Sequence, residues 1–90
     1  MEDAIRAVVE RIEPHYAFDS HFVISQLIKR HSDVYIRFAG PDETTAQMHA
    51  RIAHIIQATG LVRRLPQQSW SDNIHGSSTD CALWQRITVA

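Results

Sequence analysis

The chain has 90 residues, of which 44% are hydrophobic and 21% charged, and its formal net charge is −1. These values are ordinary for one globular domain and exclude a compositionally disordered chain. The single cysteine, Cys81, excludes an internal disulfide framework and any multi-cysteine zinc site. The slight net acidity argues against a protein that coats nucleic acid through charge alone.

No apolar stretch approaches the roughly 20 residues that a membrane-spanning helix requires. The first residues, Met1-Glu2-Asp3, are acidic and lack the positive start of a secretory signal. We therefore expect a cytoplasmic protein without membrane contact. A domain of this size buries only a modest share of its surface, so pairing with a second copy would stabilise it, and we expect a homodimer.

The first predicted helix runs from about Asp3 to Glu13. Asp3 can cap its start, and Pro14 ends it because proline restricts the residue before it. Four apolar residues at i, i+3, i+4 and i+7 form one stripe: Ile5, Val8, Val9 and Ile12.

A second helix is predicted to begin after Asp19, because aspartate is a favoured N-cap residue. Its inward side is expected to hold Phe22, Val23, Leu27 and Ile28.

The segment 32–39 allows two interpretations. Its run of β-branched and aromatic residues is typical of a strand. As a helix, the segment would be capped by Ser32 and would carry Val34, Tyr35 and Phe38 on one face. We favour a short helix because no partner strand is obvious nearby in the sequence.

The clearest element is a helix from about Glu43 to Thr59, with Asp42 as its expected N-cap. Gly60 follows at the position where a left-handed C-cap is favoured. The side expected to face the core carries Met48, Ile52, Ile55, Ile56 and Thr59. Another side carries Gln47, Arg51 and His54, with Thr44 near its edge.

The C-terminal third predicts a β-hairpin. One strand covers Leu61–Leu65 and ends at Pro66, and the other covers Cys81–Val89. A long polar loop, residues 67–80, would connect them. The predicted fold class is therefore α+β, with N-terminal helices followed by a C-terminal β-hairpin.

The order of three helices and a hairpin resembles that of a winged helix–turn–helix domain. The likeness is carried by the tract Thr45–Arg64, which is similar to a recognition helix running into its first wing strand, and it extends over residues 19–90. The tail, with Asn73-Ile74-His75-Gly76 and Cys81-Ala82-Leu83-Trp84, is also similar to that of small uncharacterised bacterial proteins, some carried on mobile gene cassettes. That second likeness implies no activity.

The winged-helix resemblance implies a DNA-binding or regulatory protein whose third long helix enters the major groove of duplex DNA. Gln47 would bond adenine, Arg51 guanine, and Thr44 a base or a phosphate, with His54 on the same helix. At the base of the wing, Arg63 and Arg64 would hold phosphates. The segment 44–70 contains three arginines and no acidic residue, which fits this interpretation. The alternative is that the polar residues of this helix are simply a solvated face.

The sequence predicts no metal site, no cofactor and no enzyme. His49 and His54 are five residues apart and do not share a helical face, and no histidine has an acidic neighbour at ligand spacing on a confident helix. Cys81 with His75 and Asp72 is the only nucleophilic trio that can be assembled, and we expect Cys81 to be a buried, inert thiol. His49 is expected to be half-buried and His75 to lie in a turn.

A second function remains open, namely a dimeric protein-interaction or assembly module without nucleic-acid affinity. Trp70 and Trp84 favour a core cluster that joins the hairpin to the helices. Alternatively, one of them lies in a dimer interface, for which Trp70 is the better candidate. The sequence identifies no small-molecule ligand.

Overall fold

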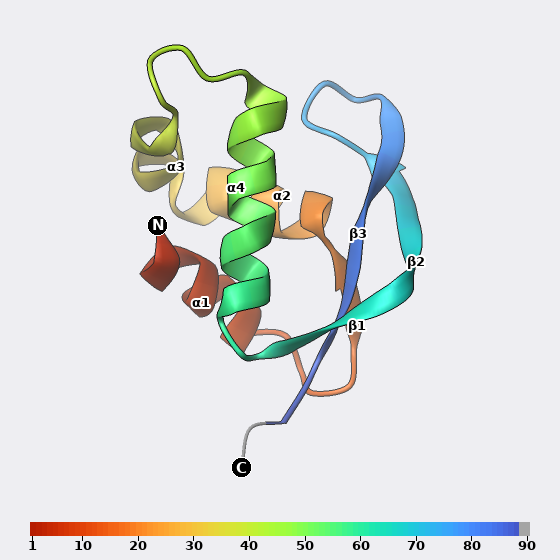
Figure 1. Cartoon of the computed structure of the whole chain (residues 1–90). Helices are drawn as coiled ribbons and strands as arrows, with labels where there is room; N and C mark the ends of the chain where they lie inside the picture. Colours follow the sequence, from red (N-terminus) through yellow and green to blue (C-terminus); the bar gives the residue numbers. More distant parts are fainter. Residues whose placement is uncertain (89–90) are drawn as a thin grey trace.

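A computed structural model describes residues 1–88 as four helices and a three-stranded antiparallel sheet (Figure 1). The α+β class and the placement of the helices ahead of a hairpin are confirmed. None of the four helices is both long and apolar enough to cross a bilayer. The elements in chain order are α1 (Glu2–Glu10), β1 (Ala17–Asp19), α2 (Ser20–Arg30), α3 (Ser32–Phe38), α4 (Thr45–Ala58), β2 (Val62–Asp72) and β3 (Ser78–Arg86).

The first helix is shorter than predicted. After Glu10 the amides of Arg11 and Ile12 bond to carbonyls three residues back instead of four, which tightens and ends the helix before Pro14. The expected cap is also wrong, because Met1 is the N-cap residue and Asp3 lies inside the first turn. The predicted apolar stripe is correct for Ile5, Val8 and Val9, which are all buried.

The short strand β1 has no counterpart in the sequence prediction. Its three residues pair antiparallel with β3, so that Phe18 lies opposite Trp84. The sheet order is therefore β1-β3-β2, with β3 in the centre. A strand of three residues has too short a pattern to detect, since its partner lies more than 60 residues further along the chain.

The capping prediction for α2 is confirmed. The Asp19 carboxylate accepts a hydrogen bond from the backbone N–H of Phe22 at 2.8 Å. The buried side holds Ser20, Val23, Ile24 and Leu27. The predicted inward positions Phe22 and Ile28 are partly exposed instead, because the helix is rotated so that Ile24 takes the central place.

The ambiguous segment is a helix, as favoured. None of its side chains is fully buried, but Val34, Tyr35 and Phe38 pack against the edge of the core. Ser32 does not provide the cap, because His31 holds the N-cap position without a side-chain bond.

In α4 the N-cap is Thr44 and not Asp42. Thr44 and Gln47 form a capping box, which satisfies two backbone N–H groups and explains why the helix starts two residues later than expected. Gly60 has φ +73°, the left-handed conformation that the sequence predicted after the helix. Met48, Ile52 and Ile56 are buried.

The hairpin is longer and its loop shorter than predicted. β2 continues past Pro66 to Asp72, so residues 67–72 belong to a strand and only residues 73–77 form the turn. The strand pairing shifts between Arg64 and Gln68, and Pro66 lies within this irregularity. Proline lacks the N–H that a ladder needs, and an edge strand such as β2 tolerates it at a bulge. The predicted end of the last strand, Val89, lies outside the described residues.

The core lies where α1, α2 and α4 meet the sheet. Trp84 is 1% exposed, and its indole Nε1–H donates to Gln57 Oε1 of α4 at 3.0 Å. Trp70 is 69% exposed, so the two tryptophans do not form a common cluster. The buried apolar residues that form the main cluster are Ala4, Ile5, Val8, Val9, Phe18, Val23, Ile24, Leu27, Ile52, Ile56, Leu61, Val62 and Trp84.

Candidate functional site

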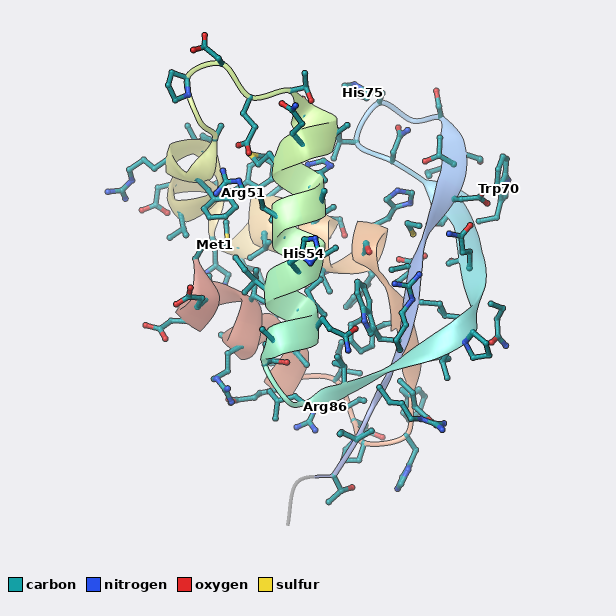
Figure 2. All side chains as sticks on the ribbon, in the orientation of Figure 1. Met1, Arg51, His54, Trp70, His75 and Arg86 are labelled. Carbon is teal, nitrogen blue, oxygen red and sulfur yellow. The ribbon has the colours of Figure 1, made fainter. Side chains whose placement is uncertain are left out.

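A groove of about 440 Å³ separates α4 from the hairpin, and we call it the α4–hairpin groove. The wall formed by α4 is lined mainly by small residues, whereas the opposite wall comes from the turn and from the start of β3. Figure 2 shows His75 of the turn beside the first turn of α4. Three histidines and the cysteine line this groove: His21, His49, His75 and Cys81.

Thr44 and Gln47 lie together at the N-terminus of α4. The Thr44 hydroxyl accepts from the Gln47 backbone N–H at 3.1 Å, and Gln47 Oε1 accepts from the Thr44 N–H at 2.9 Å. Both side chains are exposed, and the Gln47 amide nitrogen takes no part in this box. His54 is exposed two turns further along, on the same side as Gln47. These three residues share an exposed surface, whereas Arg51, which the sequence predicts on the same side, does not join them.

Arg51 points away from that surface toward α3 (Figure 2). Its guanidinium donates to both carboxylate oxygens of Glu43 at 2.5 Å and to the Phe38 carbonyl at 2.7 Å, and it stacks 3.9 Å from the Phe38 ring. Glu43 also accepts from the Gly40 N–H at 3.0 Å. The hydrogen bonds from Arg51 lower the pKa of Glu43 to about 2, and the same pairing raises the pKa of Arg51. Arg51 therefore holds the connection between α3 and α4.

Arg63 and Arg64 point to opposite faces of β2 because they are adjacent in one strand. Arg63 donates to Gln85 Oε1 at 2.6 Å, and Arg64 lies 5.8 Å from the Trp84 ring. Trp84 bonds to Gln57 of α4, so Arg64 is on the sheet face that α4 covers, and Arg63 is on the other. Both arginines are exposed. The six predicted site residues are thus divided between four directions.

A hydrogen-bonded cluster, which sequence reasoning missed, joins the start of α2 to the hairpin. Asp19 Oδ2 accepts from the hydroxyls of Ser69 and Ser71, both at 2.7 Å. Ser71 Oγ also lies 2.7 Å from His21 Nδ1 and 3.9 Å from Cys81 Sγ. Since the Ser71 proton goes to Asp19, its oxygen accepts from Nδ1–H, which leaves the lone pair of His21 Nε2 free.

The electrostatics of this cluster keep Asp19 ionised. Burial raises its pKa, but the hydrogen bonds from Ser69, the Phe22 N–H and Ser71, together with the charge of His21, outweigh burial, so the pKa is lowered. Asp19 is therefore a carboxylate that accepts three hydrogen bonds.

Donor atoms of Asp19, His21 and Cys81 lie within 4.8 Å of one another. Each of the three residues is half-buried. The sequence groups Cys81 with His75 and Asp72. The structure places Cys81 beside Asp19 and His21, which lie about 60 positions earlier in the chain. Pairing of β1 with β3 causes this, because it sets Asp19 opposite Leu83, two residues from Cys81. Without β1 no sequence signal could have united these residues.

His49 is half-buried, as predicted, and its Nε2 lies 2.8 Å from the Tyr35 hydroxyl. Burial lowers the pKa of His49, and the charges of His21 and His75 lower it further. His75 lies in the hairpin turn, as expected, where its N–H bonds to the Asn73 side chain. His49 and His75 thus line the same groove as His21 and Cys81.

In comparisons with protein families, with curated proteins and with solved structures, the chain has no significant match. Its function is therefore inferred from its own residues and their arrangement.

Proposed function

We propose that this chain is a small cytoplasmic DNA-binding or regulatory protein of winged-helix type that acts as a homodimer. The observation that carries the proposal is the long β2–β3 hairpin beside α4 (Figure 1). The outward side of α4 is exposed at Gln47 and His54. In this proposal α4 enters the major groove of duplex DNA and the hairpin serves as the wing.

The exposed residues of α4 supply the proposed base contacts. The Gln47 amide nitrogen is not used in the capping box, so it can donate to a base edge. His54 lies two turns away on the same side, and Thr44 lies at the helix N-terminus, where backbone N–H groups favour a phosphate. In this proposal Arg51 contacts guanine only after it breaks its ion pair with Glu43 and binds the base instead.

Arg63 and Arg64 supply the proposed phosphate contacts at the base of the hairpin. Both guanidinium groups are exposed, and their present partners are neutral: a glutamine amide for Arg63 and an indole ring for Arg64. A phosphate can therefore engage either one without breaking an ion pair. The Arg64 side chain lies on the face of the sheet nearer to α4, which makes it the stronger of the two candidates.

The test is a titration of labelled duplex DNA at increasing salt with the wild type and with Arg63→Ala and Arg64→Ala. Phosphate contact predicts that log affinity falls linearly with log salt, and that each variant reduces the slope by about one. Arg37→Ala is the matched control, since Arg37 is an exposed arginine on α3 paired with Asp33 at 2.9 Å. Its slope should equal that of the wild type. If the wild type does not bind duplex DNA even at low salt, the proposal is wrong.

The second candidate function is a dimeric protein-interaction or assembly module without nucleic-acid affinity. The exposure of Trp70 favours it, because tryptophan is enriched where interfaces are most tightly packed. Sedimentation of the wild type and Trp70→Ser over a range of concentrations tests this candidate. If Trp70 is buried between two copies, the dimer dissociation constant of the variant should be at least about tenfold higher than that of the wild type. A wild type that remains monomeric throughout would exclude this candidate.

A further inference from the structure

Asp19, His21 and Cys81 carry three different donor types that divalent zinc accepts together. A thiolate, an imidazole and a carboxylate are all common zinc ligands, and the sulfur disfavours magnesium and calcium, which prefer oxygen. Three protein ligands with one further position are also the usual composition of an open zinc site. The donor set therefore points to zinc or to a similar borderline metal.

The backbone holds these donors close together before any ion arrives. Asp19 is the N-cap of α2 and belongs to β1, which pairs with β3, so Asp19 and Cys81 are held on neighbouring strands. Zinc–ligand distances of about 2.0–2.3 Å imply donor separations of roughly 3.3–3.8 Å in a tetrahedron. The present separations of up to 4.8 Å exceed these values by about 1 Å, so binding requires the three side chains to close by that amount.

The hydrogen bonds around the cluster orient its members for such an ion. Ser71 links His21 Nδ1 to Asp19 and lies 3.9 Å from Cys81 Sγ, so its hydroxyl holds the three donor residues around one point. Nδ1 is the ring nitrogen that faces this point, so coordination by all three residues would use Nδ1 and replace the hydrogen bond to Ser71. Asp19 accepts three hydrogen bonds, and a carboxylate offers about four lone-pair positions, so one remains for a metal.

The α4–hairpin groove provides access to the cluster. His21 and Cys81 line it, so an ion can enter from solvent and keep water as a fourth ligand.

From these observations we infer that Asp19, His21 and Cys81 bind one divalent zinc-type ion, which joins the start of α2 to the β2–β3 hairpin. The inference does not depend on DNA binding, because it requires only the fold and these donors. Binding requires loss of the thiol proton, so it releases protons and weakens as the pH falls.

The experiment is a titration of the reduced full-length chain with Co²⁺, followed by displacement with Zn²⁺. The expected result is one cobalt ion per chain, with a thiolate-to-cobalt charge-transfer band in the near ultraviolet that Zn²⁺ abolishes. Cys81→Ser should remove the band. His21→Gln and Asp19→Asn should keep the fold, since asparagine also caps helices, and should each weaken cobalt binding by about tenfold or more.

His54→Gln and Asp33→Asn are the matched controls, because they make the same chemical changes at exposed positions outside the cluster. Both should bind cobalt as the wild type does. The inference is overturned if the wild type gives no band with excess Co²⁺. It is also overturned if the band is unchanged in His21→Gln and Asp19→Asn, since that result would assign the metal to the thiol alone. A stoichiometry of one ion per two chains would likewise contradict a site formed within one chain.

A second measurement, thermal unfolding, tests the inference even if the His21 and Asp19 variants fold poorly. Zn²⁺ should raise the thermal midpoint of the wild type in a concentration-dependent way, because it binds the folded state, and it should leave that of Cys81→Ser unchanged. An equal rise in both proteins would contradict the inference.

Discussion

Two carboxylates anchor two different parts of this fold, and they do so by different means. Glu43 holds the α3–α4 connection through charge, because its main partner is the guanidinium of Arg51. Asp19 holds the hairpin against α2 through neutral groups, namely two serine hydroxyls and one backbone N–H. The Arg51 side chain is 44% exposed, whereas the Asp19 cluster is half-buried.

The difference matters for stability and for function. An ion pair with an exposed partner contributes little because water and salt screen it, whereas a buried acceptor that loses its donors leaves them unsatisfied. The Glu43 pair also turns Arg51 away from the outward surface of α4. The Asp19 cluster does the opposite, because it gathers His21 and Cys81 at the α4–hairpin groove.

The largest expected effect is that of Asp19→Ala, which removes the acceptor for all three donors. It should lower the free energy of unfolding by about 2–3 kcal/mol, which combines a lost helix cap with unsatisfied serine hydroxyls. Asp19→Asn retains the capping oxygen and should recover about half of the loss. Urea denaturation measures both. Equal losses in the two variants would mean that the cap contributes nothing.

A smaller effect is expected for Ser71→Ala. The variant removes the link between His21 and Asp19 but leaves Asp19 bonded to Ser69 and to the α2 backbone, so we expect a loss of about 1 kcal/mol. Ser25→Ala is the control, because the Ser25 hydroxyl makes one exposed bond within α2. It should stay within about 0.5 kcal/mol of the wild type. If both serine variants behave alike, the cluster has no special role in holding the hairpin.

Local signals in the sequence were sufficient for most of the helical part. Asp19 as a cap, Gly60 as a left-handed C-cap and the helix at 32–39 all depend on residues within a few positions of one another. Thr44 and not Asp42 caps α4, because the capping box adds a second hydrogen bond through the Gln47 side chain.

Long-range pairing could not be predicted in the same way. Pro66 predicts the end of a strand, but at the sheet edge a bulge accommodates the proline and the strand continues. β1 and, with it, the meeting of Asp19 and Cys81 depend on a contact between distant segments. The partner of Arg51 was equally hidden, because Glu43 lies eight residues earlier and outside the helix. The proposed DNA-binding residues remain a prediction.

The smallest expected effect sharpens the comparison through pH. The pKa of Glu43 in the folded chain is about 2, below its ordinary value of 4.5, so the stabilisation from this carboxylate is fully present above about pH 4.5. It is lost progressively as the pH falls toward 2, where the folded-state carboxyl is protonated. Glu43→Gln removes the charge at every pH. The stability difference between wild type and variant should therefore shrink across this window, as measured by urea denaturation at pH 5, about 3.5 and about 2.5.

Arg51 accounts for most of this dependence, since its hydrogen bonds are the largest cause of the lowered pKa of Glu43. When Arg51 is replaced by alanine, the stability difference between the chains with Glu43 and with Glu43→Gln should change little with pH. Asp19 does not confound the result, because its own acid titration is present in both members of each pair and cancels. A difference that stays constant between pH 5 and 2.5 in the wild-type background would show that charge does not hold the α3–α4 connection. The contrast between the two carboxylates would then fail, because Glu43, like Asp19, would act only as an acceptor of hydrogen bonds.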